Sequence, residues 1–397
     1  MYNAEEYNQK KIATSLIERM NEIIPQTDRL IPLHEPEFDE QECELVLNCL
    51  RSGWVSSVGN YVTDFENSVA DFCNVDYGVA VVNGTAGLEL ALKACGVQPN
   101  DEVLLPSLTF VATANAVSNI GAIPHFLDVD QVTLGIDPEK MEGYLTSISD
   151  RQCGDLVNRK TGRKISLLVV MHTFGHPVDM DNINRVCRKF EIPCVEDAAE
   201  ALGSEYKGRK CGSLGNVAVV SFNGNKIITT GGGGAVLTND LEIADRVRHL
   251  STTAKIAHRW EFDHDMVAHN YRLPNLNASL GMAQMEKLPQ KIKAKRKLAE
   301  KYIQLFADFG DCQIFKEPIT SSSNYWLNTL ILKNTSGTQL KDFLLQELND
   351  KGYQARPCWK LMHELSFYKD CPRSDMQTSE KLYNSIINLP SSPNLVS

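Results

Sequence analysis

The chain has 397 residues, which is long enough for a large hydrophobic core and predicts roughly two or three domain-sized units. With 43% hydrophobic and 23% charged residues, its composition is that of an ordinary soluble globular protein. The formal net charge of -10 argues against generic binding to nucleic acids or to anionic membranes, and leaves room for a local basic pocket that binds a phosphorylated small molecule.

Cysteine usage and the N-terminal sequence predict a cytoplasmic location. The eleven cysteines include no pair at C-x-x-C spacing, and Cys73, Cys95, Cys187 and Cys194 lie in apolar surroundings, as reduced core cysteines usually do. The stretch MYNAEEYNQK lacks the apolar core of a secretory signal, and no run reaches the ~18 apolar residues of a membrane span. We therefore expect a cytoplasmic protein with reduced thiols and no membrane segment.

An amphipathic, charge-mixed segment at 1–30 precedes a region with the pattern of an α/β sheet. Seven short apolar runs recur in that region: GVAVVN, EVLLP, IPHFLDVD, ISLLVVMHT, IPCVED, NVAVVSF and GAVLTN. Helical patterns at 85–96 and 181–191 separate early runs, which predicts a sheet buried on both faces. Because a loop alone joins the last two runs, we expect a mixed sheet. The polar insertion at 147–164 is expected to be a surface loop.

The pattern changes after about residue 270 to that of a smaller α+β unit. Its expected elements are a long helical stretch over 276–309 interrupted at Pro289, a strand over 325–332, a helix over 338–352 and a short extended stretch at 353–357. The expected organisation is an N-terminal helical extension at 1–30, a large α/β domain at 31–270 and a small C-terminal α+β domain at 271–397.

The stretch SFNGNKIITTGGGGAVLTND at 221–240 places Lys226 ahead of four consecutive glycines. Glycine reaches positive φ without steric cost, so the run indicates a tight turn or a close approach of a ligand to the backbone. A phosphate-binding Walker loop needs its glycines before the lysine, so that explanation fails. A lone lysine is most often a solvated surface charge. The residues at the ends of the other predicted strands decide whether Lys226 is such a surface charge or a catalytic residue.

Two other predicted strand ends carry polar groups at the edge where α/β sheets bind ligands. Gly84 and Thr85 open a helix whose free N–H groups suit a phosphate, although Thr85 is also a good helix N-cap. Glu196 and Asp197 end an apolar run, where a carboxylate is costly without a cationic or hydrogen-bonding partner. A protonated pyridine nitrogen is such a partner for Asp197. The alternative is that Asp197 caps the alanine-rich helix expected after it.

Asp197, Ser221 and Lys226 together have the layout that a pyridoxal phosphate enzyme needs. In such enzymes a lysine forms a Schiff base with the cofactor, an aspartate keeps the ring nitrogen protonated, and hydroxyls with helix amides hold the phosphate. Lys226 follows Asp197 by 29 positions and Ser221 by five positions.

Five motifs then resemble the DegT-type nucleotide-sugar aminotransferases, which are pyridoxal phosphate enzymes of fold type I. These motifs are NGTAGLELAL, PSLTFVATANAV, EDAAEALGS, SFNGNKIITTGGGGAVLTND and HNYRLPNLNASLGMAQ. The resemblance spans residues 31–390 and implies a mixed, mostly parallel seven-stranded sheet flanked by helices, with a smaller C-terminal α+β domain.

The same resemblance implies roles for the matching residues. Lys226 would bind the cofactor covalently and shuttle the proton, and Asp197 would pair with the pyridinium nitrogen. Gly84, Thr85 and Ser221 would hold the cofactor phosphate.

Further positions match the family or depart from it. Phe110 stands where the family has an aromatic that stacks on the cofactor ring. Asn270 matches an asparagine that the partner subunit supplies to the phosphate, which implies a homodimer with shared active sites. Glu200, counted with the cofactor residues, stands where many family members have glutamine or histidine. Whether it contacts the sugar or the ring hydroxyl is left open by this difference. Gly232 replaces a common glutamate, with an expected effect on loop shape. Lys226 favours transamination, because related sugar dehydratases carry histidine there.

Candidate substrate contacts come from other motifs. Ser56 and Ser57 lie in a stretch that resembles the family's substrate-side loop, where either could touch the sugar or the diphosphate. The expected role of neighbouring Trp54 is at least as much packing as substrate contact. His172 lies at a strand end and could orient a ring hydroxyl. Arg272 and Arg356 could meet substrate phosphates or a glutamate carboxylate, with surface ion pairs as the alternative. No metal site is expected, because three further histidines lack any ligand pattern around them: His258, His264 and His269.

The resemblance implies an enzyme that moves an amino group from L-glutamate to a keto sugar carried on a nucleotide. Motifs such as IPLHEP, GWVSSVG and HTFGHP look most like the branch that serves legionaminic acid and bacillosamine-type sugars of bacterial surface glycans. That branch implies amination at carbon 4 of a UDP-linked 4-keto-6-deoxy-N-acetylhexosamine. The alternatives are a dTDP-linked keto sugar, a pyridoxal phosphate-binding protein without transaminase activity, and a lyase or aminodehydroxybenzoate-type synthase.

Overall fold

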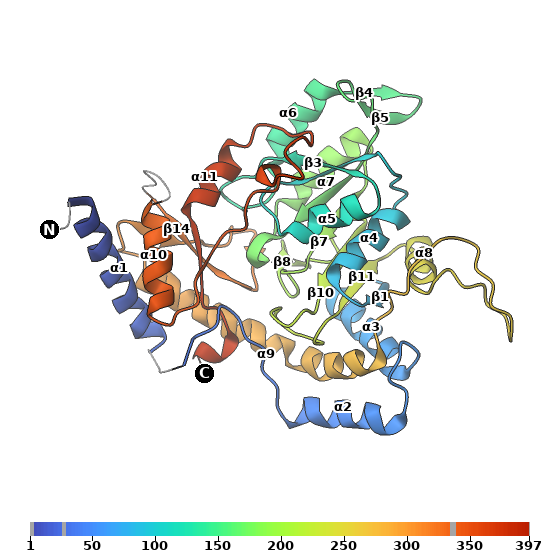
Figure 1. Cartoon of the computed structure of the whole chain (residues 1–397), viewed down its shortest axis with the longest axis horizontal. Helices are drawn as coiled ribbons and strands as arrows, with labels where there is room; N and C mark the ends of the chain where they lie inside the picture. Colours follow the sequence, from blue (N-terminus) through green and yellow to red (C-terminus); the bar gives the residue numbers. More distant parts are fainter. Residues whose placement is uncertain (1–3, 26–28, 334–338, 397) are drawn as a thin grey trace.

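The computed structural model describes residues 4–25, 29–333 and 339–396, and Figure 1 shows the whole chain. A seven-stranded sheet with helices on both sides forms one unit. A smaller unit, built from the C-terminal part of the chain and the N-terminal helix, lies beside it. No helix in the described ranges combines the length and the apolar character needed to cross a membrane.

All seven predicted strands are present in the main sheet. Its strands, in spatial order, are β1 (Tyr77–Val81), β11 (Gly234–Thr238), β10 (Val217–Ser221), β7 (Cys194–Asp197), β6 (Ile165–Met171), β2 (Glu102–Pro106) and β3 (Ile123–Leu127). β11 pairs antiparallel with both of its neighbours, and the other pairs are parallel. The loop that joins β10 directly to β11 leaves no crossover helix, so β11 must run in the opposite direction. The prediction of a mixed, mostly parallel sheet is confirmed.

Helices cover both faces of this sheet, which explains why its strands read as unbroken apolar runs. Along β6, Leu168 and Val170 pack into one core, and Leu167 and Val169 pack into the other. The first core is closed by α3 (Asn60–Cys73), α6 (Pro138–Ile148), α7 (Met180–Phe190) and the start of α9 (Asn275–Leu305). The second is closed by α4 (Gly84–Ala94), α5 (Val111–Asn119) and α8 (Leu241–Ser251).

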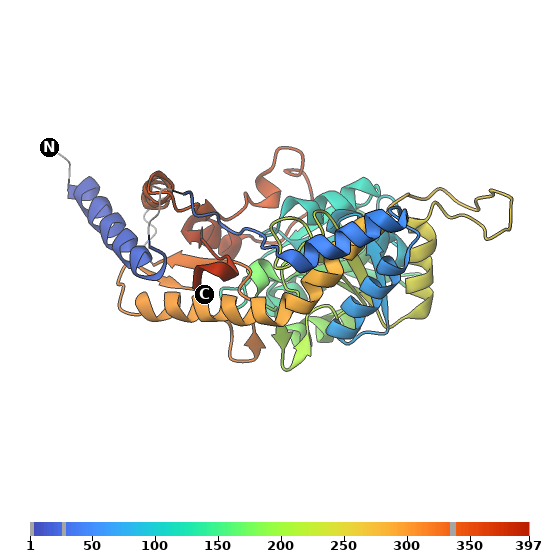
Figure 2. The same ribbon diagram turned by 90° about the horizontal axis from the view of Figure 1, so that it is seen from below.

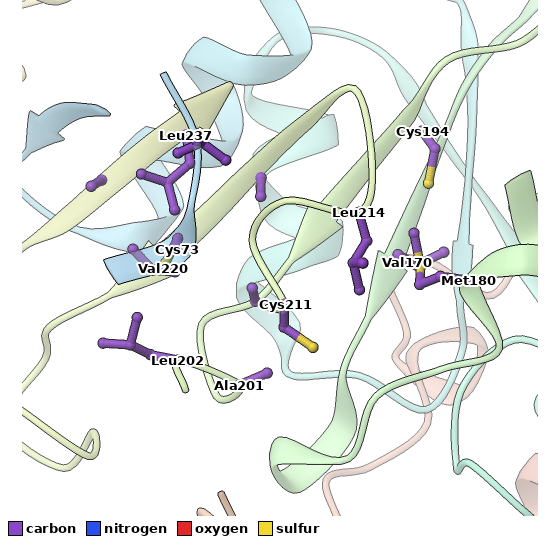
Figure 3. Close-up of a cluster of buried hydrophobic side chains, with 14 of the residues drawn as sticks. Cys73, Val170, Met180, Cys194, Ala201, Leu202, Cys211, Leu214, Val220 and Leu237 are labelled. Carbon is purple, nitrogen blue, oxygen red and sulfur yellow. The ribbon is translucent and has the colours of Figure 1, made fainter. Parts of the chain in front are cut away.

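Several thiols are part of the first core. Figure 3 shows Cys73, Cys194 and Cys211 among aliphatic side chains of the strands and of α7. Burial raises the pKa of the Cys73 thiol to about 12, so that the thiol stays protonated. All eleven cysteines are free, and of the four expected in apolar surroundings only Cys95 is partly exposed.

The polar insertion at 147–164 differs from the predicted surface loop, because part of it forms a hairpin. The hairpin consists of β4 (Ser149–Gln152) and β5 (Asp155–Asn158). Its two turn residues, Cys153 and Gly154, have φ of 51° and 93°. Positive φ at both turn positions is the geometry that lets two strands meet through a two-residue turn.

The smaller unit contains the predicted C-terminal strand and helix as β14 (Asn328–Leu332) and α10 (Gln339–Asp350). β14 belongs to a four-stranded sheet in the order β12 (Cys312–Ile314), β14, β16 (Ile386–Leu389) and β15 (Arg356–Pro357). The remaining elements near it are α11 (Gln377–Ser385) and the short strands β8 (Glu205–Tyr206), β9 (Arg209–Lys210) and β13 (Ser321–Ser322).

The expected interruption at Pro289 is wrong, because α9 runs as one helix from Asn275 to Leu305. Proline removes one backbone hydrogen bond from a helix interior. Burial of Met285 and Leu288 on the preceding turn stabilises α9 at this point. Figure 2 shows α9 running beneath both units, with α2 (Glu40–Ser52) packed along its first part.

The predicted N-terminal helix is present as α1 (Ala4–Ile23) and packs on the smaller unit (Figure 1). Leu16 and Met20 are fully buried in a core that they share with Leu298, Leu348 and Tyr353. The hydroxyl of Tyr353 donates to the carbonyl of Ile24 at 2.7 Å. Helix α1 is therefore a packed part of the smaller unit.

Leu16→Ala should lower the free energy of unfolding by about 2–5 kcal/mol, because it leaves a cavity between α1 and the rest of this core. Glu18→Ala is the matched control, because Glu18 lies on the exposed side of the same helix and should change stability by less than about 0.5 kcal/mol. Urea unfolding of both variants measures the difference. Equal values for the two variants would show that α1 adds no stability to the fold.

Candidate active site

A cavity of about 310 Å³ lies where the parallel strands of the main sheet end. Its walls come from residues that follow β1, β7 and β10, from the start of α5, and from two tryptophans of the C-terminal part of the chain. Ligands of open α/β sheets bind at this edge. Seven of the eight predicted catalytic and cofactor residues line it: Gly84, Thr85, Phe110, Asp197, Glu200, Ser221 and Lys226.

The two carboxylates that end β7 have different surroundings. Glu196 is fully buried and accepts hydrogen bonds from the backbone N–H groups of Gly212, Leu214 and Gly215, at 2.9, 2.6 and 2.6 Å. Its Oε2 also lies 3.0 Å from Nε2 of His172. Consecutive strand residues point to opposite faces, so Glu196 points into the protein and Asp197 lines the cavity.

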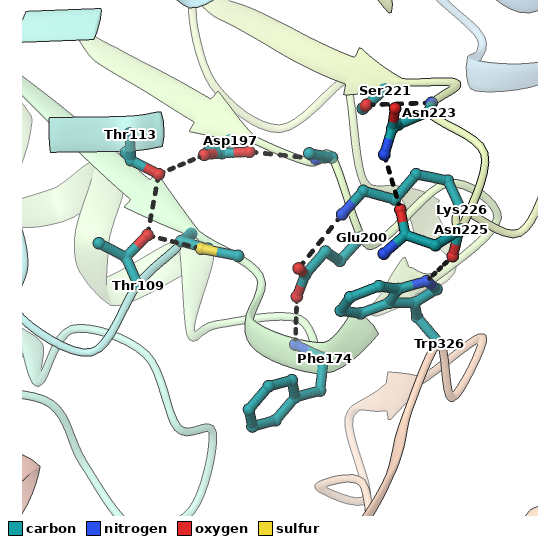
Figure 4. Close-up of polar contacts among 12 residues, drawn as sticks. Thr109, Thr113, Phe174, Asp197, Glu200, Ser221, Asn223, Asn225, Lys226 and Trp326 are labelled. Carbon is teal, nitrogen blue, oxygen red and sulfur yellow. Dashed lines mark hydrogen bonds and ion pairs between the residues drawn. The ribbon is translucent and has the colours of Figure 1, made fainter. Parts of the chain in front are cut away.

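Asp197 is a buried carboxylate with two donors at hand, as Figure 4 shows. The Thr113 hydroxyl donates to Oδ2 at 2.7 Å, and the backbone N–H of Ala199 donates to Oδ1 at 3.2 Å. Burial raises the pKa of Asp197 above its ordinary value, although these donors and Lys226 act in the opposite direction. The capping alternative fails, because the residues after Asp197 form turns and no α-helix. A cationic ring nitrogen in the cavity would stabilise this carboxylate.

The other end of the cavity is suited to an anion. The side chain of Asn83 caps α4 by accepting from the N–H of Ala86 at 2.8 Å, so Thr85 is not the cap. The N–H groups of the first helical residues, Gly84 and Thr85, have no partner within the helix. A Cβ on Gly84 would lie 3.2 Å from Cβ and 3.4 Å from Oγ of Ser221. Glycine therefore keeps the amides and the hydroxyl close together, as a phosphate site requires.

Lys226 lies inside the cavity with 11% of its side chain exposed, which excludes a solvated surface charge. Its Nζ is 3.3 Å from Oε1 of Glu200 and 4.1 Å from the ring centroid of Trp326 (Figure 4). The loop that carries it is held by Trp326, whose Nε1 donates to the carbonyl of Asn225 at 2.8 Å. The lysine amine therefore points toward the same space as Asp197 and Ser221.

Glu200 is 3% exposed and lies between Lys226 and the backbone. Its Oε2 accepts from the N–H of Phe174 at 2.9 Å. Burial raises the pKa of Glu200 to about 7, although Lys226 lowers it. A carboxyl group beside the lysine is thus able to change its charge near neutral pH.

Aromatic side chains close the remaining sides of the cavity. Phe110 precedes α5, is 46% exposed and meets Trp359 at 6.1 Å between ring centroids. Trp326 and Trp359 were not predicted as site residues. Trp326 stands in a run typical of a core strand, and Trp359 follows β15 outside any strongly patterned segment. No signal in the sequence relates either tryptophan to the end of a distant sheet.

The four predicted substrate residues lie outside this cavity. His172 is fully buried, where one ring nitrogen contacts Glu196 and the other accepts from the N–H of Val178 at 3.2 Å. Arg272 forms an ion pair with Glu66 at 2.5 Å. Ser56 and Arg356 are exposed, and Arg356 donates to Oδ1 of Asn349 at 3.2 Å. Their substrate roles stay predictions.

Asn270 also lies outside the cavity of its own chain. Asn270 is exposed, and it lies at the base of a long loop between α8 and α9, where it bridges Thr252. This loop extends away from the main sheet in Figures 1 and 2. Gly232 lies in the Lys226 loop with its Cβ position 3.9 Å from the nearest atom, so this position has room for a side chain.

Glu196→Gln and Asp197→Asn should have opposite effects on the cofactor-free protein. Glu196→Gln places an amide N–H group among backbone donors and should cost about 3–5 kcal/mol of unfolding free energy. Asp197→Asn removes a buried charge with few partners, so stability at neutral pH should be equal or higher, while cofactor affinity falls. Urea unfolding and a cofactor titration measure both properties.

The pH dependence of the unfolding free energy provides the control for the Asp197→Asn prediction. Because its pKa is raised in the folded protein, the stabilisation from this group is present at low pH and lost as the pH rises through the raised value. The stability of Asp197→Asn relative to the unmodified protein should therefore increase from about pH 4 to about pH 7. A constant difference would contradict the assignment of Asp197 as the poorly compensated carboxylate.

Known proteins share this fold. The chain is 35% identical over 367 residues to GDP-perosamine synthase of Escherichia coli O157:H7, covering 92% of this chain and 94% of that protein. It is 35% identical over 370 residues to GDP-perosamine synthase of Vibrio cholerae, covering 92% and 95%. The crystal structure of the aminotransferase TlmJ from Streptoalloteichus hindustanus superposes with a TM-score of 0.82 at 30% identity, covering 91% and 93%.

These likenesses agree with the chemistry of the cavity. The buried carboxylate, the lysine amine and the anion-binding end are the donor set that pyridoxal phosphate requires. The fold is that of fold type I aminotransferases, and the cofactor is pyridoxal phosphate. The protein is a nucleotide-sugar aminotransferase. Residues 36–397 match the family described as DegT/DnrJ/EryC1/StrS aminotransferases, and the chain belongs to that family.

Proposed function

We propose that this aminotransferase takes an amino group from L-glutamate and places it on carbon 4 of a UDP-linked 4-keto-6-deoxy-N-acetylhexosamine. The observation that supports the reaction type is the meeting of Lys226, Asp197 and Ser221 in one cavity. The acceptor rests on the likeness of several sequence motifs to the branch that makes precursors of bacterial surface glycans such as legionaminic acid.

The residues of the chain divide the catalytic work. The bound cofactor supplies a ring that withdraws the electron pair released at the substrate carbon. Asp197 holds a proton at the ring nitrogen, which keeps the ring electron-poor. Nζ of Lys226 carries the proton that leaves the donor carbon. Gly84, Thr85 and Ser221 bind the phosphate and fix the orientation of the ring.

The size of the cavity limits which part of the nucleotide sugar it can recognise. Its volume of about 310 Å³ is at the low end for ligand pockets, so cofactor and sugar ring together fill it. The nucleotide attached to that sugar would then extend beyond the cavity. This favours recognition of the keto sugar inside the site and of the base by residues beyond it.

A GDP-linked keto sugar is a second candidate acceptor. Two relatives that are 35% identical to this chain over at least nine-tenths of their length are named GDP-perosamine synthase. Their names indicate a GDP-linked amino sugar as product, which supports the same type of reaction on another nucleotide. A dTDP-linked keto sugar is the third acceptor to be compared.

The proposal includes a homodimer in which Asn270 reaches the phosphate site of the partner subunit. Asn270 is exposed on an excursion that carries large exposed apolar side chains. Trp260, Phe262 and Val267 are 68%, 79% and 92% exposed. Apolar side chains gathered on one segment are typical of a surface that another protein covers. A second copy that covers this segment would bring Asn270 toward a cavity.

The absorbance of the bound cofactor tests both half-reactions. L-Glutamate should remove the band of the lysine-bound cofactor, and a UDP-linked 4-keto-6-deoxy-N-acetylhexosamine should restore it. GDP- and dTDP-linked keto sugars are compared at equal concentration. Lys226→Ala is the control and should show neither change, since the covalent link is absent. Restoration by the GDP-linked sugar alone would replace the proposed acceptor, and loss without any restoration would exclude all three sugars.

Mixed dimers test the shared site. Asn270→Ala should weaken phosphate binding in the site of the partner subunit, so dimers of this variant alone should lose cofactor affinity and turnover. Mixing it with Lys226→Ala chains should restore about a quarter of the activity, because half of the dimers are mixed and each then has one complete site. If no mixture regains activity, Asn270 does not act across the interface.

A further inference from the structure

Lys226 has a defined position in the structure, between a carboxylate and an aromatic ring. Its Nζ lies 3.3 Å from Oε1 of Glu200 and 4.1 Å from the centroid of the Trp326 ring (Figure 4). A carboxylate and the face of a tryptophan both attract a positive charge, and the effect is stronger where water is excluded. These two groups together form a binding position for a lysine ammonium.

Both groups are fixed by other parts of the chain before Lys226 reaches them. Oε2 of Glu200 accepts from the N–H of Phe174 at 2.9 Å, which leaves Oε1 for the lysine. The indole N–H of Trp326 donates to Asn225, and its backbone N–H donates to Oδ1 of Asn324 at 2.8 Å. Because these contacts do not involve the Lys226 side chain, little further ordering of the two groups is required for them to bind the ammonium.

We infer that Glu200 and Trp326 form a holding site for the Lys226 ammonium in those states of the catalytic cycle in which the lysine is protonated and not bound to the cofactor. In this exchange the donor nitrogen would form the double bond to the cofactor carbon, and the double bond from that carbon to Nζ would break. The two protons that the donor ammonium gives up would end on Nζ, which becomes an ammonium. The holding site stabilises this charge and thereby favours the state with free lysine. Glu200 and Trp326 are positioning residues that act through Lys226.

The inference depends on the carboxylate at position 200. A glutamine or a neutral histidine at this position would offer Nζ no negative charge. The inference rests on Lys226 as the reacting amine and holds for any of the three nucleotide sugars compared above.

The charge of Glu200 makes the holding site dependent on pH. Lys226, Asp197 and the thiol of Cys358 are the titratable groups around Glu200. Burial raises the pKa of Glu200 to about 7, and Asp197 contributes in the same direction. Burial raises the pKa of the Cys358 thiol and lowers that of His34, which lies near Lys226, so both groups stay uncharged. The holding site is therefore charged above about pH 7 and loses its charge below this value.

Chemical labelling of the cofactor-free full-length chain tests the inference without catalysis. Acetic anhydride acylates neutral amines, and peptide mass spectrometry measures labelling of Lys226 relative to exposed Lys316. At about pH 8.5, Glu200→Gln should increase the labelling of Lys226 by about tenfold, because the ammonium loses its charged partner. At about pH 6 the two proteins should be labelled equally, because Glu200 is then protonated.

The matched control is Glu205→Gln, which removes the carboxylate of the Glu205–Lys210 pair at the protein surface. This variant should leave the labelling of Lys226 unchanged at both pH values. Unchanged or reduced labelling of Lys226 in Glu200→Gln at about pH 8.5 would overturn the inference, because the carboxylate would then not stabilise the ammonium.

The holoenzyme provides a second measurement. The ratio of L-glutamate to 2-oxoglutarate at which half of the lysine-bound absorbance is lost should be about tenfold higher in Glu200→Gln than in the unmodified enzyme above about pH 7. An equal ratio in the two proteins would contradict the inference. This titration contains no sugar, so a wrong acceptor does not affect it. A wrong amino donor would give no spectral response in either protein, and the labelling result would stand.

Discussion

Two consecutive carboxylates at the end of one buried strand impose the constraint on which the active site depends. Burying a carboxylate is costly unless its oxygens find donors, and the alternation of β7 sends Glu196 and Asp197 to opposite faces. Glu196 is compensated by three backbone N–H groups and by His172, and so organises the turns of residues 211–215. Asp197 has fewer donors and faces the cavity, where a cationic cofactor ring would complete its environment. The protein alone leaves this charge poorly compensated, which is why we propose that the cofactor ring binds beside it.

Around that carboxylate, distant segments contribute different chemical properties to one small space. The start of α4 provides backbone amides, the loop after β10 provides Lys226, and the C-terminal part of the chain provides aromatic faces. In the proposed reaction Lys226 alternates between two states, one linked covalently to the cofactor and one free. Glu200 and Trp326 give its free state a defined position.

The sequence allowed the main sheet and the centre of the site to be predicted, because both depend on local signals. Strands buried on both faces leave continuous apolar runs, and charged residues directly after such runs, as at Asp197, have few structural explanations. The sequence did not indicate Trp326 or Trp359, because their role depends on how the smaller unit packs against the sheet. The expected helix interruption at Pro289 is wrong for a related reason. Burial of residues on both sides of Pro289 stabilises a helix that the local preference of proline would end.

The continuity of α9 has a mechanical consequence. A helix of 31 residues is about 46 Å long, and this one contributes its first turns to the core beneath the sheet and its last turns to the core of the smaller unit. Because α9 joins the two units as one continuous helix, they cannot rotate relative to each other as domains on a flexible linker can. A hinge motion that separated the two units would have to bend α9, and it would bend most easily at Pro289, which lacks one backbone hydrogen bond. Access for a bulky substrate is therefore expected to depend on motion of surface loops, with the two bodies keeping their relative orientation.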